Sequence, residues 1–426
     1  MSDYLVFPPA REVRGTVVAP PSKSGTNRAL VLAALSRRVV SLVRPLDSED
    51  TRVLIRCLAA MGASIAVTPD GLAIHGPLGG ASGREVELDA GESGTAARFL
   101  TAVCAVTPGK FLLTGAARLR ERPMGGLVTA LAALGARIAF RGGQGVLPLA
   151  IEGGGLVSRT VTVDASQSSQ FVSALLLAGA ASEGGLAVRT VGSVASSPYV
   201  AMTVESLRAF GHTVDTEVGL DVRPARVPPE RYEVSGDFSS ALPLLAASGV
   251  AGGEVSVEGL TWPSADADAL AVLVLERFGL AISAESGRVA AAGGASLTPA
   301  VVRATDFPDA VPALVALAAF APGVSRFEGI GHLRWKESDR IQALVRLLES
   351  AGVEAAAEEE AISVSGPPAP KGSHGLRRLP TFGDHRIAMA GALLSLRLPG
   401  LAIENPDCVG KSYPSFFRDL DRLVLR

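Results

Sequence analysis

Cysteine, tryptophan and surplus charge are all scarce in this sequence of 426 residues, which has 3 Cys, 2 Trp and a formal net charge of −2. The cysteines Cys57, Cys104 and Cys408 are far apart and odd in number, so they predict neither a disulfide framework nor a zinc site. We interpret them as small buried apolar side chains. A nearly neutral chain has no general affinity for nucleic acid or an acidic membrane, because both partners need a basic surface.

Long apolar runs are missing as well. No segment reaches the length of a membrane span, and the first residues lack the apolar core of a signal peptide. The nucleotide-binding signature Gly-x-x-x-x-Gly-Lys-[Ser/Thr] is also absent, so nucleotide binding is not supported. With 48% hydrophobic residues, the chain has enough apolar material for two or three domains. We therefore expect a soluble, cytoplasmic globular protein.

One unit recurs along the chain at a spacing of about 70 residues. A helix pattern that ends in glycine precedes a strand pattern at Gly62, Gly135, Gly211, Gly279 and Gly352. Glycine ends helices in the left-handed conformation without steric cost, so each is interpreted as a helix stop. A second helix pattern, with a polar start and an Ala/Leu body, recurs six times. It is apolar all round, which predicts burial inside a domain.

Ser, Thr, Asp and Gly are concentrated where these apolar helices begin. Such residues cap helices, and helix N-termini carry free N–H donors with a positive partial charge. Nearby segments add cations: SKSGTNR, RLRERPMGG, HLRWKESDR, GDHR and GKSYP. A cleft that gathered these segments would attract anions. Taken singly, each segment is also typical of an ordinary cap or a solvated loop, and in DFPDA the candidate cap is Asp306.

The chain resembles the enolpyruvyl transferases, and within them the branch that uses shikimate 3-phosphate, in segments that occur in the family's order. These segments are PPSKSGTNRAL, SGTAAR, RERPMGGLVTAL, SSQFVSALL, DFPDA, KESDR, GDHRIAM and GKSYPSFF. The resemblance implies an α/β fold of two similar domains. Each has three repeated strand/helix units with buried helices, an inside-out α/β barrel, and the active site is in the interdomain cleft. We expect one domain at 21–236 and the other at 1–20 with 237–426, with a hinge near Pro20 and Val234–Asp237.

The resemblance also implies a reaction. The enolpyruvyl group of phosphoenolpyruvate moves to the 5-hydroxyl of shikimate 3-phosphate and phosphate is released, by addition and then elimination. This reaction belongs to the shikimate pathway to chorismate and the aromatic amino acids. No metal or organic cofactor is implied. We expect a monomer whose only partners are these two substrates, and we expect shikimate 3-phosphate to close the two domains.

Site residues are implied position by position. The implied ligands of shikimate 3-phosphate are Lys23, Ser24, Arg28, Ser168, Ser169, Gln170, Ser196, Tyr199, Asp309, His332 and Lys336. Those of phosphoenolpyruvate are Lys23, Gly94, Arg122, Gln170, Arg340, His385, Arg386 and Lys411. Asp309 is implied as the base for the 5-hydroxyl and Glu337 as the acid that protonates the methylene carbon, with Lys23 as a third catalytic group. Two carboxylates fit because each proton of an addition and elimination needs a positioned carrier.

Three positions depart from the family's pattern. Glu92 and His332 stand where asparagine is common, and Phe99 replaces a proline.

Two alternative functions stay open. The sister transferase that uses UDP-N-acetylglucosamine commonly has a cysteine in the loop corresponding to RLRERPMGG, and this loop has none. A non-catalytic repeat scaffold would explain the repeats and caps, but not why Asp309 and Glu337 accompany the cations.

Overall fold

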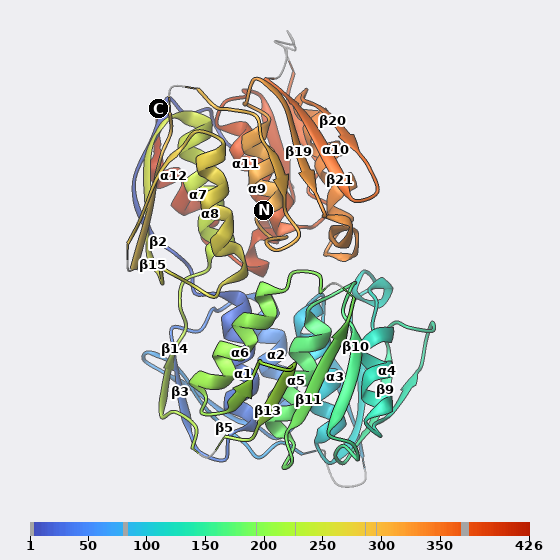
Figure 1. Cartoon of the computed structure of the whole chain (residues 1–426). Coiled ribbons are helices and arrows are strands. Elements are labelled where there is room, and N and C mark those ends of the chain that lie inside the picture. Colours follow the sequence, from blue (N-terminus) through green and yellow to red (C-terminus); the bar gives the residue numbers. More distant parts are fainter. Residues whose placement is uncertain are drawn as a thin grey trace. The chain divides into compact units, whose positions relative to one another are not determined.

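The computed structural model describes residues 4–79, 84–192, 194–225, 227–285, 287–294, 296–367 and 375–426. The chain divides into two compact units, which we call unit 1 (Met1–Pro20 with Ser235–Arg426) and unit 2 (Pro21–Val234). The chain thus passes from unit 2 back to unit 1 after Val234, at the first residue of the expected hinge segment. Figure 1 labels the elements of both units.

Unit 2 contains six α-helices and one 3-10 helix in its described residues. They are α1 (Lys23–Leu35), α2 (Glu49–Ala60), α3 (Gly94–Val106), η1 (Leu119–Glu121), α4 (Gly125–Ala133), α5 (Gln170–Ala181) and α6 (Pro198–Ala209). The strands are β3 (Val40–Val43), β4 (Ser64–Thr68), β5 (Gly71–His75), β6 (Glu85–Asp89), β7 (Gly109–Thr114), β8 (Arg137–Phe140), β9 (Leu149–Gly153), β10 (Thr160–Asp164), β11 (Leu186–Val191), β12 (Thr213–Asp215), β13 (Leu220–Arg223) and β14 (Arg231–Glu233).

Unit 1 alternates strands and helices in the same way. Its helices are α7 (Phe238–Ala251), η2 (Ala267–Ala269), α8 (Leu270–Arg277), α9 (Val311–Ala318), η3 (Gly331–Trp335), α10 (Arg340–Ala351), α11 (His385–Ser395), η4 (Pro406–Lys411) and α12 (Phe416–Leu423). Its strands are β1 (Tyr4–Val6), β2 (Glu12–Val18), β15 (Gly253–Leu260), β16 (Ala281–Glu285), β17 (Gly287–Ala292), β18 (Val301–Arg303), β19 (Gly323–Glu328), β20 (Glu354–Ala357), β21 (Ala361–Gly366), β22 (Arg377–Leu379), β23 (Leu401–Glu404) and β24 (Val424–Leu425).

Six sheets, three in each unit, confirm the six expected repeats in the described part of the chain. Those of unit 2 have the orders β14-β3-β5-β4, β6-β7-β9-β8 and β10-β11-β13-β12, and those of unit 1 have the orders β16-β17-β15-β2-β24, β18-β19-β21-β20 and β1-β23-β22. Each sheet combines a parallel pair with antiparallel neighbours: β6 runs parallel to β7, for example, and β7 antiparallel to β9. The shared pairing pattern shows that one folding unit has been used repeatedly.

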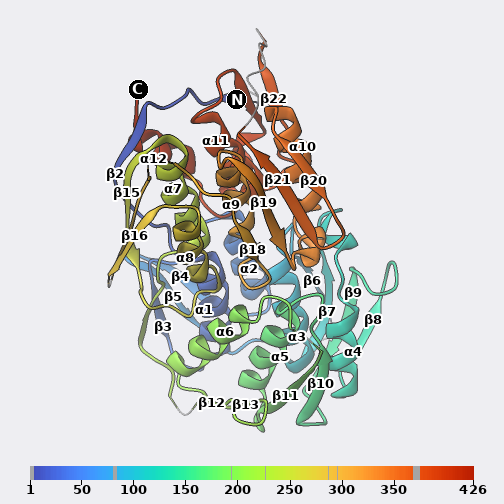
Figure 2. The same ribbon diagram turned by 45° about the horizontal axis from the view of Figure 1, so that its top comes forward.

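Strands from distant parts of the chain complete several sheets. In unit 2, β14 lies parallel to β3. In unit 1, β2 lies parallel to β15, with Val13 opposite Gly253 and Val18 opposite Glu258 (Figure 2). Strand β1 pairs antiparallel with β23. These pairings attach the N-terminal segment to unit 1, and they leave unit 2 as one continuous stretch of chain.

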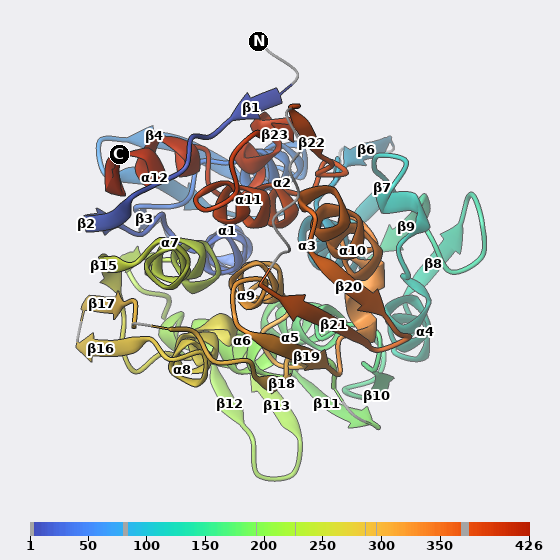
Figure 3. The same cartoon turned by 90° about the horizontal axis from the view of Figure 1, so that it is seen from above.

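Three apolar helices fill the inside of each unit, as the sequence predicts. Figure 3 shows α7, α9 and α11 next to one another in unit 1, with the sheets of that unit around them. All residues of α9 and α11 are buried, and α3 and α5 are buried over most of their length. Small alanines let these helices lie close to their neighbours. No helix in the described residues combines the length and apolarity needed to cross a membrane.

The expected helix ends are confirmed. The five glycines that were expected to end helices follow α2, α4, α6, α8 and α10, and their φ angles lie between +82° and +96°. Ser22, Ser93, Asp237 and Asp384 cap α1, α3, α7 and α11 with their side chains. The alternative role of Asp306 as a cap is wrong, because α9 begins only at Val311 and its N-cap is Ala310. The chain instead turns at 308–310 before the helix starts.

The cysteines agree with the sequence interpretation in two cases of three. Cys57 and Cys104 are buried, but Cys408 is only partly buried, so the expectation of a fully buried side chain was wrong there. Burial, followed by the charge of a nearby aspartate, raises the pKa of Cys57 to about 11 and that of Cys408 to about 12. All three thiols are free in the structure. Raised pKa values keep Cys57 and Cys408 protonated near neutral pH.

The helix stops give a first testable prediction. Gly62→Ala forces an L side chain into φ +96°, although the nearest atom to the new Cβ would be 3.6 Å away. We expect the free energy of unfolding of unit 2 to fall by about 1–2 kcal/mol from backbone strain alone. Gly154→Ala is the control, because its new Cβ meets nothing within 4 Å and its φ is ordinary. Urea unfolding measures both; equal stability of the two variants would contradict the assignment.

Candidate active site

Arg28 connects the beginnings of two helices in unit 2. From α1, its Nε donates to Thr203 Oγ1 at 2.8 Å and its Nη2 donates to the Tyr199 carbonyl at 2.9 Å, both in α6. Its Nη1 donates to the Ser24 carbonyl at 2.9 Å. The guanidinium carbon lies 5.5 Å from the centre of the Phe99 ring. Phe99, which replaces the family's proline, therefore packs a π-face against this cation.

Lys23 is held by a carboxylate that sequence reasoning missed. Its Nζ lies 3.4 Å from Asp50 Oδ2, and both side chains are buried. Lys23 opens α1 and Asp50 lies in the first turn of α2. In the sequence, Asp50 looks like any acid in a first helical turn, so only the packing of α2 against α1 identifies it as the partner of Lys23.

The start of α5 carries several polar groups. Gln170 donates from Nε2 to Thr95 Oγ1 at 3.1 Å, which joins α5 to α3. The other amide atom of Gln170, Oε1, is buried and has no hydrogen-bond partner in the described part of the chain. An unsatisfied buried acceptor costs about 1–3 kcal/mol, so this atom is suited to receive a bond from a ligand. Ser168 caps the backbone of Gln170 at 3.2 Å, and the neighbouring Ser169 is buried.

Ser196 has an unusual backbone conformation. It is buried and has φ +57°, a region that few residues other than glycine occupy. Such conformations persist where the surrounding structure imposes them, and they are concentrated at functional sites. Ser196 lies two residues before the start of α6, next to the N-cap residue Ser197. This predicted ligand therefore lies where the fold holds the chain in a strained turn.

Arg122 lies directly over Gly94. A Cβ atom added to Gly94 would be only 2.5 Å from Arg122 Nη1, so glycine is needed for this close approach. Arg98, also missed from the sequence, donates to the carbonyls of Gly94 at 3.2 Å and Pro123 at 2.7 Å. It thereby joins the start of α3 to the loop that carries Arg122. Glu92 is exposed in the turn before α3.

Asp309 is the centre of a second group, in unit 1. Its Oδ1 lies 2.8 Å from Arg340 Nη1 and 3.4 Å from Lys336 Nζ, and its Oδ2 lies 3.9 Å from Arg386 Nη2. Burial by itself would raise the pKa of Asp309, but the positive charges of these three side chains hold it well below its usual value. Asp309 is therefore ionised at neutral pH.

Arg340 contacts three carboxylates at the start of α10. Besides Asp309, its Nη2 lies 2.9 Å from Glu337 Oε2 and its Nε lies 2.8 Å from Asp384 Oδ2. Although burial opposes its charge, the carboxylates raise the pKa of Arg340 above its ordinary value. Asp384 is the N-cap of α11, as the polar starts of the apolar helices lead one to expect, but its contact with Arg340 was not expected.

The remaining cations of unit 1 lie at the start of α11 and at the end of η4. Arg386, in the first turn of α11, donates from Nη1 to the Ser239 carbonyl at 2.7 Å, and Ser239 in turn donates to Asp237. His385 is fully buried beside it. Lys411 is buried at the end of η4. Ser239 and Asp237 open α7, so contacts between side chains place the starts of α7, α10 and α11 together.

His332 is neutral at physiological pH. It lies in η3, and burial, then the charges of Lys336 and Arg340, lower the pKa of His332 to about 4. The opposing charge of Asp309 is too weak to reverse this shift. A neutral imidazole can still make a hydrogen bond, but it adds no positive charge to this group.

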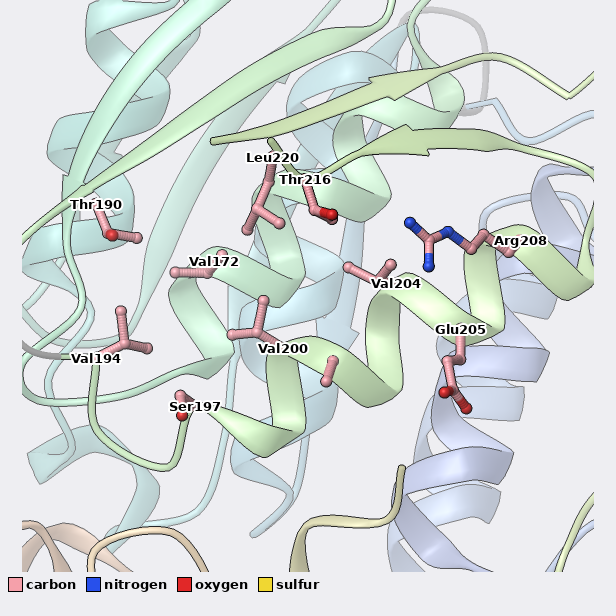
Figure 4. Close-up of a pocket in the computed structure, with 11 residues that line it drawn as sticks. Val172, Thr190, Val194, Ser197, Val200, Val204, Glu205, Arg208, Thr216 and Leu220 are labelled. Carbon is pink, nitrogen blue, oxygen red and sulfur yellow. The ribbon is translucent and has the colours of Figure 1, made fainter. Parts of the chain in front are cut away.

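A pocket of about 360 Å³ lies in unit 2, and its lining includes none of the cations described above (Figure 4). Its lining comes from α5, α6 and the strands β11 and β13, and is mainly apolar, with Val172, Val200, Val204 and Leu220. Glu205 and Arg208 are its charged residues. Because it contains none of the predicted ligands, this pocket is not a candidate for the anionic substrates.

The expected residues therefore form two groups, one in each unit. We call Lys23, Ser24, Arg28, Gly94, Arg122, Ser168, Ser169, Gln170, Ser196 and Tyr199 the unit 2 group, and Asp309, His332, Lys336, Glu337, Arg340, His385, Arg386 and Lys411 the unit 1 group. Repeat-built α/β units whose buried helices begin among cations, with carboxylates beside them, define an enzyme suited to small, multiply charged anions. Acid–base chemistry on such anions is the activity that this arrangement supports.

Comparison with known proteins gives the family. The chain belongs to the family of EPSP synthase (3-phosphoshikimate 1-carboxyvinyltransferase), whose model matches residues 8–420. It is 40% identical to the 3-phosphoshikimate 1-carboxyvinyltransferase of Thermococcus kodakarensis, over 99% of this chain and 100% of the relative. It is 37% identical to that of Methanosarcina acetivorans, over 97% and 96%. A solved EPSP synthase from Acinetobacter baumannii superposes with a TM-score of 0.78 at 26% identity, covering 99% of this chain and 98% of that one.

The ion pairs of Asp309 give a second prediction. Its folded pKa is depressed, so its charge stabilises the fold above the unfolded pKa of about 4, and this contribution is lost as the pH falls below that value. We expect Asp309→Asn to lower the free energy of unfolding by about 1–3 kcal/mol at neutral pH. The difference in the free energy of unfolding between this variant and wild type should become smaller at roughly pH 3, because Asp309 then loses part of its charge. Urea unfolding at both pH values measures it, and a difference independent of pH would contradict the ion pairing.

Proposed function

We propose that this chain catalyses the reaction of its family: transfer of the enolpyruvyl group of phosphoenolpyruvate to the 5-hydroxyl of shikimate 3-phosphate, with release of phosphate. The family model, which matches residues 8–420, and relatives that match over nearly their whole length support this proposal. The single structural observation that carries it is the set of ion pairs between Asp309 and the cations Lys336, Arg340 and Arg386. Anion-binding groups and a proton acceptor are thereby in direct contact.

The charges of the two substrates explain why the cations are spread over several elements. Each substrate has a phosphate and a carboxylate, and arginine binds such groups through parallel hydrogen bonds. For shikimate 3-phosphate we propose the ligands Lys23, Ser24, Arg28, Ser168, Ser169, Gln170, Ser196, Tyr199, Asp309, His332 and Lys336. For phosphoenolpyruvate we propose Lys23, Gly94, Arg122, Gln170, Arg340, His385, Arg386 and Lys411. That both groups bind the same substrate pair, in a cleft that closes, stays a prediction.

Asp309 is the proposed base, and its surroundings suggest how it is activated. Without substrate, three cations hold its pKa low, which makes it ionised but weakly basic. When the anionic groups of phosphoenolpyruvate bind Arg340 and Arg386, part of the positive charge near Asp309 is compensated. The pKa of Asp309 then rises toward its ordinary value, so it accepts a proton more readily.

The proposed chemistry has two steps. In the addition, the 5-hydroxyl oxygen bonds to C2 of phosphoenolpyruvate, Asp309 takes the hydroxyl proton, and Glu337 delivers a proton to C3. In the elimination, Glu337 takes a proton back from C3, the bond from C2 to the phosphate oxygen breaks, and phosphate leaves with the proton that Asp309 had accepted, so both carboxyl groups return to their starting state. Lys23, held by Asp50, and the arginines stabilise the charge of the tetrahedral intermediate.

The alternatives make different predictions. A UDP-N-acetylglucosamine transferase is not favoured, because the family segments and the named relatives point to the shikimate branch. The loop at 118–126 also has no cysteine. A non-catalytic scaffold would release phosphate with neither acceptor. Purified chain with phosphoenolpyruvate should release phosphate when given shikimate 3-phosphate and none when given UDP-N-acetylglucosamine. Release only with the sugar nucleotide, or with neither, would reject the proposal. A monomeric state and a cytoplasmic location also stay predictions.

Asp309→Asn and Glu337→Gln test the proposed proton carriers. Each removes a carboxylate while keeping the side-chain shape, so we expect turnover to fall by about 100-fold or more. Glu349→Gln is the matched control, because Glu349 lies on α10 in an exposed pair with Arg346. Steady-state phosphate release measures all three, and circular dichroism checks that they are folded. Near-normal turnover in either site variant would remove that residue from the proposed chemistry.

Gly94→Ala tests the role of Arg122. The new methyl group would occupy the space of the Arg122 guanidinium, which must then move. We expect the KM for phosphoenolpyruvate to rise by about 10-fold, the effect of about 1.4 kcal/mol of lost binding, with little change for shikimate 3-phosphate. Gly125→Ala is the control on the following helix, because its Cβ would come no closer than 3.7 Å to any atom. Equal KM values for the two variants would contradict the assignment.

A further inference from the structure

Asp384 is a fully buried carboxylate whose two oxygens are both engaged. Oδ2 accepts from Arg340 Nε at 2.8 Å and from Ser338 Oγ at 3.0 Å. Oδ1 accepts from Arg340 Nη2 at 3.3 Å and from the backbone N–H of Arg386 at 2.9 Å. One side chain thus binds the guanidinium of one proposed phosphoenolpyruvate ligand and the backbone of another.

The three carboxylates around Arg340 differ in their access to solvent. The side chains of Asp309 and Glu337 are 14% and 11% exposed, whereas those of Asp384 and Arg340 are 0% exposed. A small anion entering from solvent can reach the groups on the side of Asp309 and Glu337. It cannot reach the contact between Asp384 and Arg340 Nε.

Arg340 therefore makes two kinds of ion pair, which are partly exposed pairs with Asp309 and Glu337 and a fully buried pair with Asp384. An incoming phosphate or carboxylate can replace Asp309 and Glu337 as partners of Nη1 and Nη2 of Arg340. The pair between Asp384 and Nε would remain. A guanidinium held in this way through one edge keeps its orientation while the partners of its other edge are exchanged.

We propose that Asp384 is a positioning residue for phosphoenolpyruvate binding. It fixes the Arg340 guanidinium, and the backbone of Arg386, while the substrate replaces the exposed carboxylates. This inference rests on the proposed function. It assigns to a helix cap a task that capping alone does not require, because a cap needs only the bond to Arg386 N–H.

Two substitutions separate positioning from capping. Asn and Ser are both good N-cap residues, so Asp384→Asn and Asp384→Ser retain the bond to Arg386 N–H, but neither offers a carboxylate to Arg340. Asp339→Asn is the matched control. Asp339 caps the neighbouring helix α10 by accepting from the backbone N–H of Gln342, and it pairs with Arg334.

We expect both Asp384 variants to raise the KM for phosphoenolpyruvate by about 10-fold or more, as removal of an outer partner of a binding group typically does. The KM for shikimate 3-phosphate should change by less than about 3-fold, and the control should resemble wild type. Unchanged KM values in a folded Asp384 variant would overturn the proposal. So would equal increases for both substrates, which indicate general disruption of the site.

A double-mutant cycle gives a readout that a purely structural role would not change. If Asp384 acts through Arg340, Asp384→Asn should add little to the KM defect of Arg340→Lys. Additive defects would overturn the proposal, because they show independent action. Inactive wild type would reject the proposed function itself, whereas active wild type with an unaffected Asp384→Asn variant would reject only the positioning role.

Discussion

Burial of three apolar helices inside each unit is the constraint on which the site depends. A helix enclosed by sheets must satisfy its first N–H groups with side chains or ligands, because water cannot reach them freely. Ser22, Ser93, Asp237 and Asp384 do this for four of these helices. The same polar starts approach one another within a unit, as the bond from Gln170 to Thr95 shows. Polar residues at the starts of the buried helices therefore serve both the stability of the fold and the binding of anions.

The two groups differ in the number of carboxylates that contact their cations. In unit 2, Arg28 donates to hydroxyl and carbonyl oxygens and Lys23 pairs with the single carboxylate of Asp50. In unit 1, Arg340 is compensated by carboxylates. The unit 1 group is therefore suited to proton transfer as well as binding. In the proposed mechanism, a substrate anion that enters this group competes with the acids already present, so substrate binding and the activation of Asp309 would be coupled by charge.

The sequence allows the architecture to be predicted because its signals are local. Gly62 and its counterparts end helices through a backbone preference of one residue type, and the apolar helix bodies require burial wherever they pack. The resemblance to a family added the ligand candidates. What remained hidden depends on contacts between residues that are far apart in the sequence: Asp50 beside Lys23, and Asp384 beside Arg340. Each looks like an ordinary acid at a helix start until another helix is packed against it.

The predictions from sequence that were wrong also depend on how the chain is packed. Asp306 matches a capping pattern, but the chain turns for longer before α9 begins, and this shift leaves Asp309 in the turn beside Arg340. Cys408 was expected to be buried from its residue type alone, but it lies in η4, where it is partly exposed. Phe99 departs from the family's pattern at a position that only the structure explains, through its contact with Arg28.

The most direct test is a single turnover with the chain in excess over shikimate 3-phosphate and phosphoenolpyruvate, quenched in base at millisecond intervals. If both substrates react in one site by addition and elimination, a species that contains both of them, with the phosphate of phosphoenolpyruvate still attached, should form and decay before free phosphate reaches its full amount. Phosphate release with no such species, or from phosphoenolpyruvate alone, would contradict this chemistry.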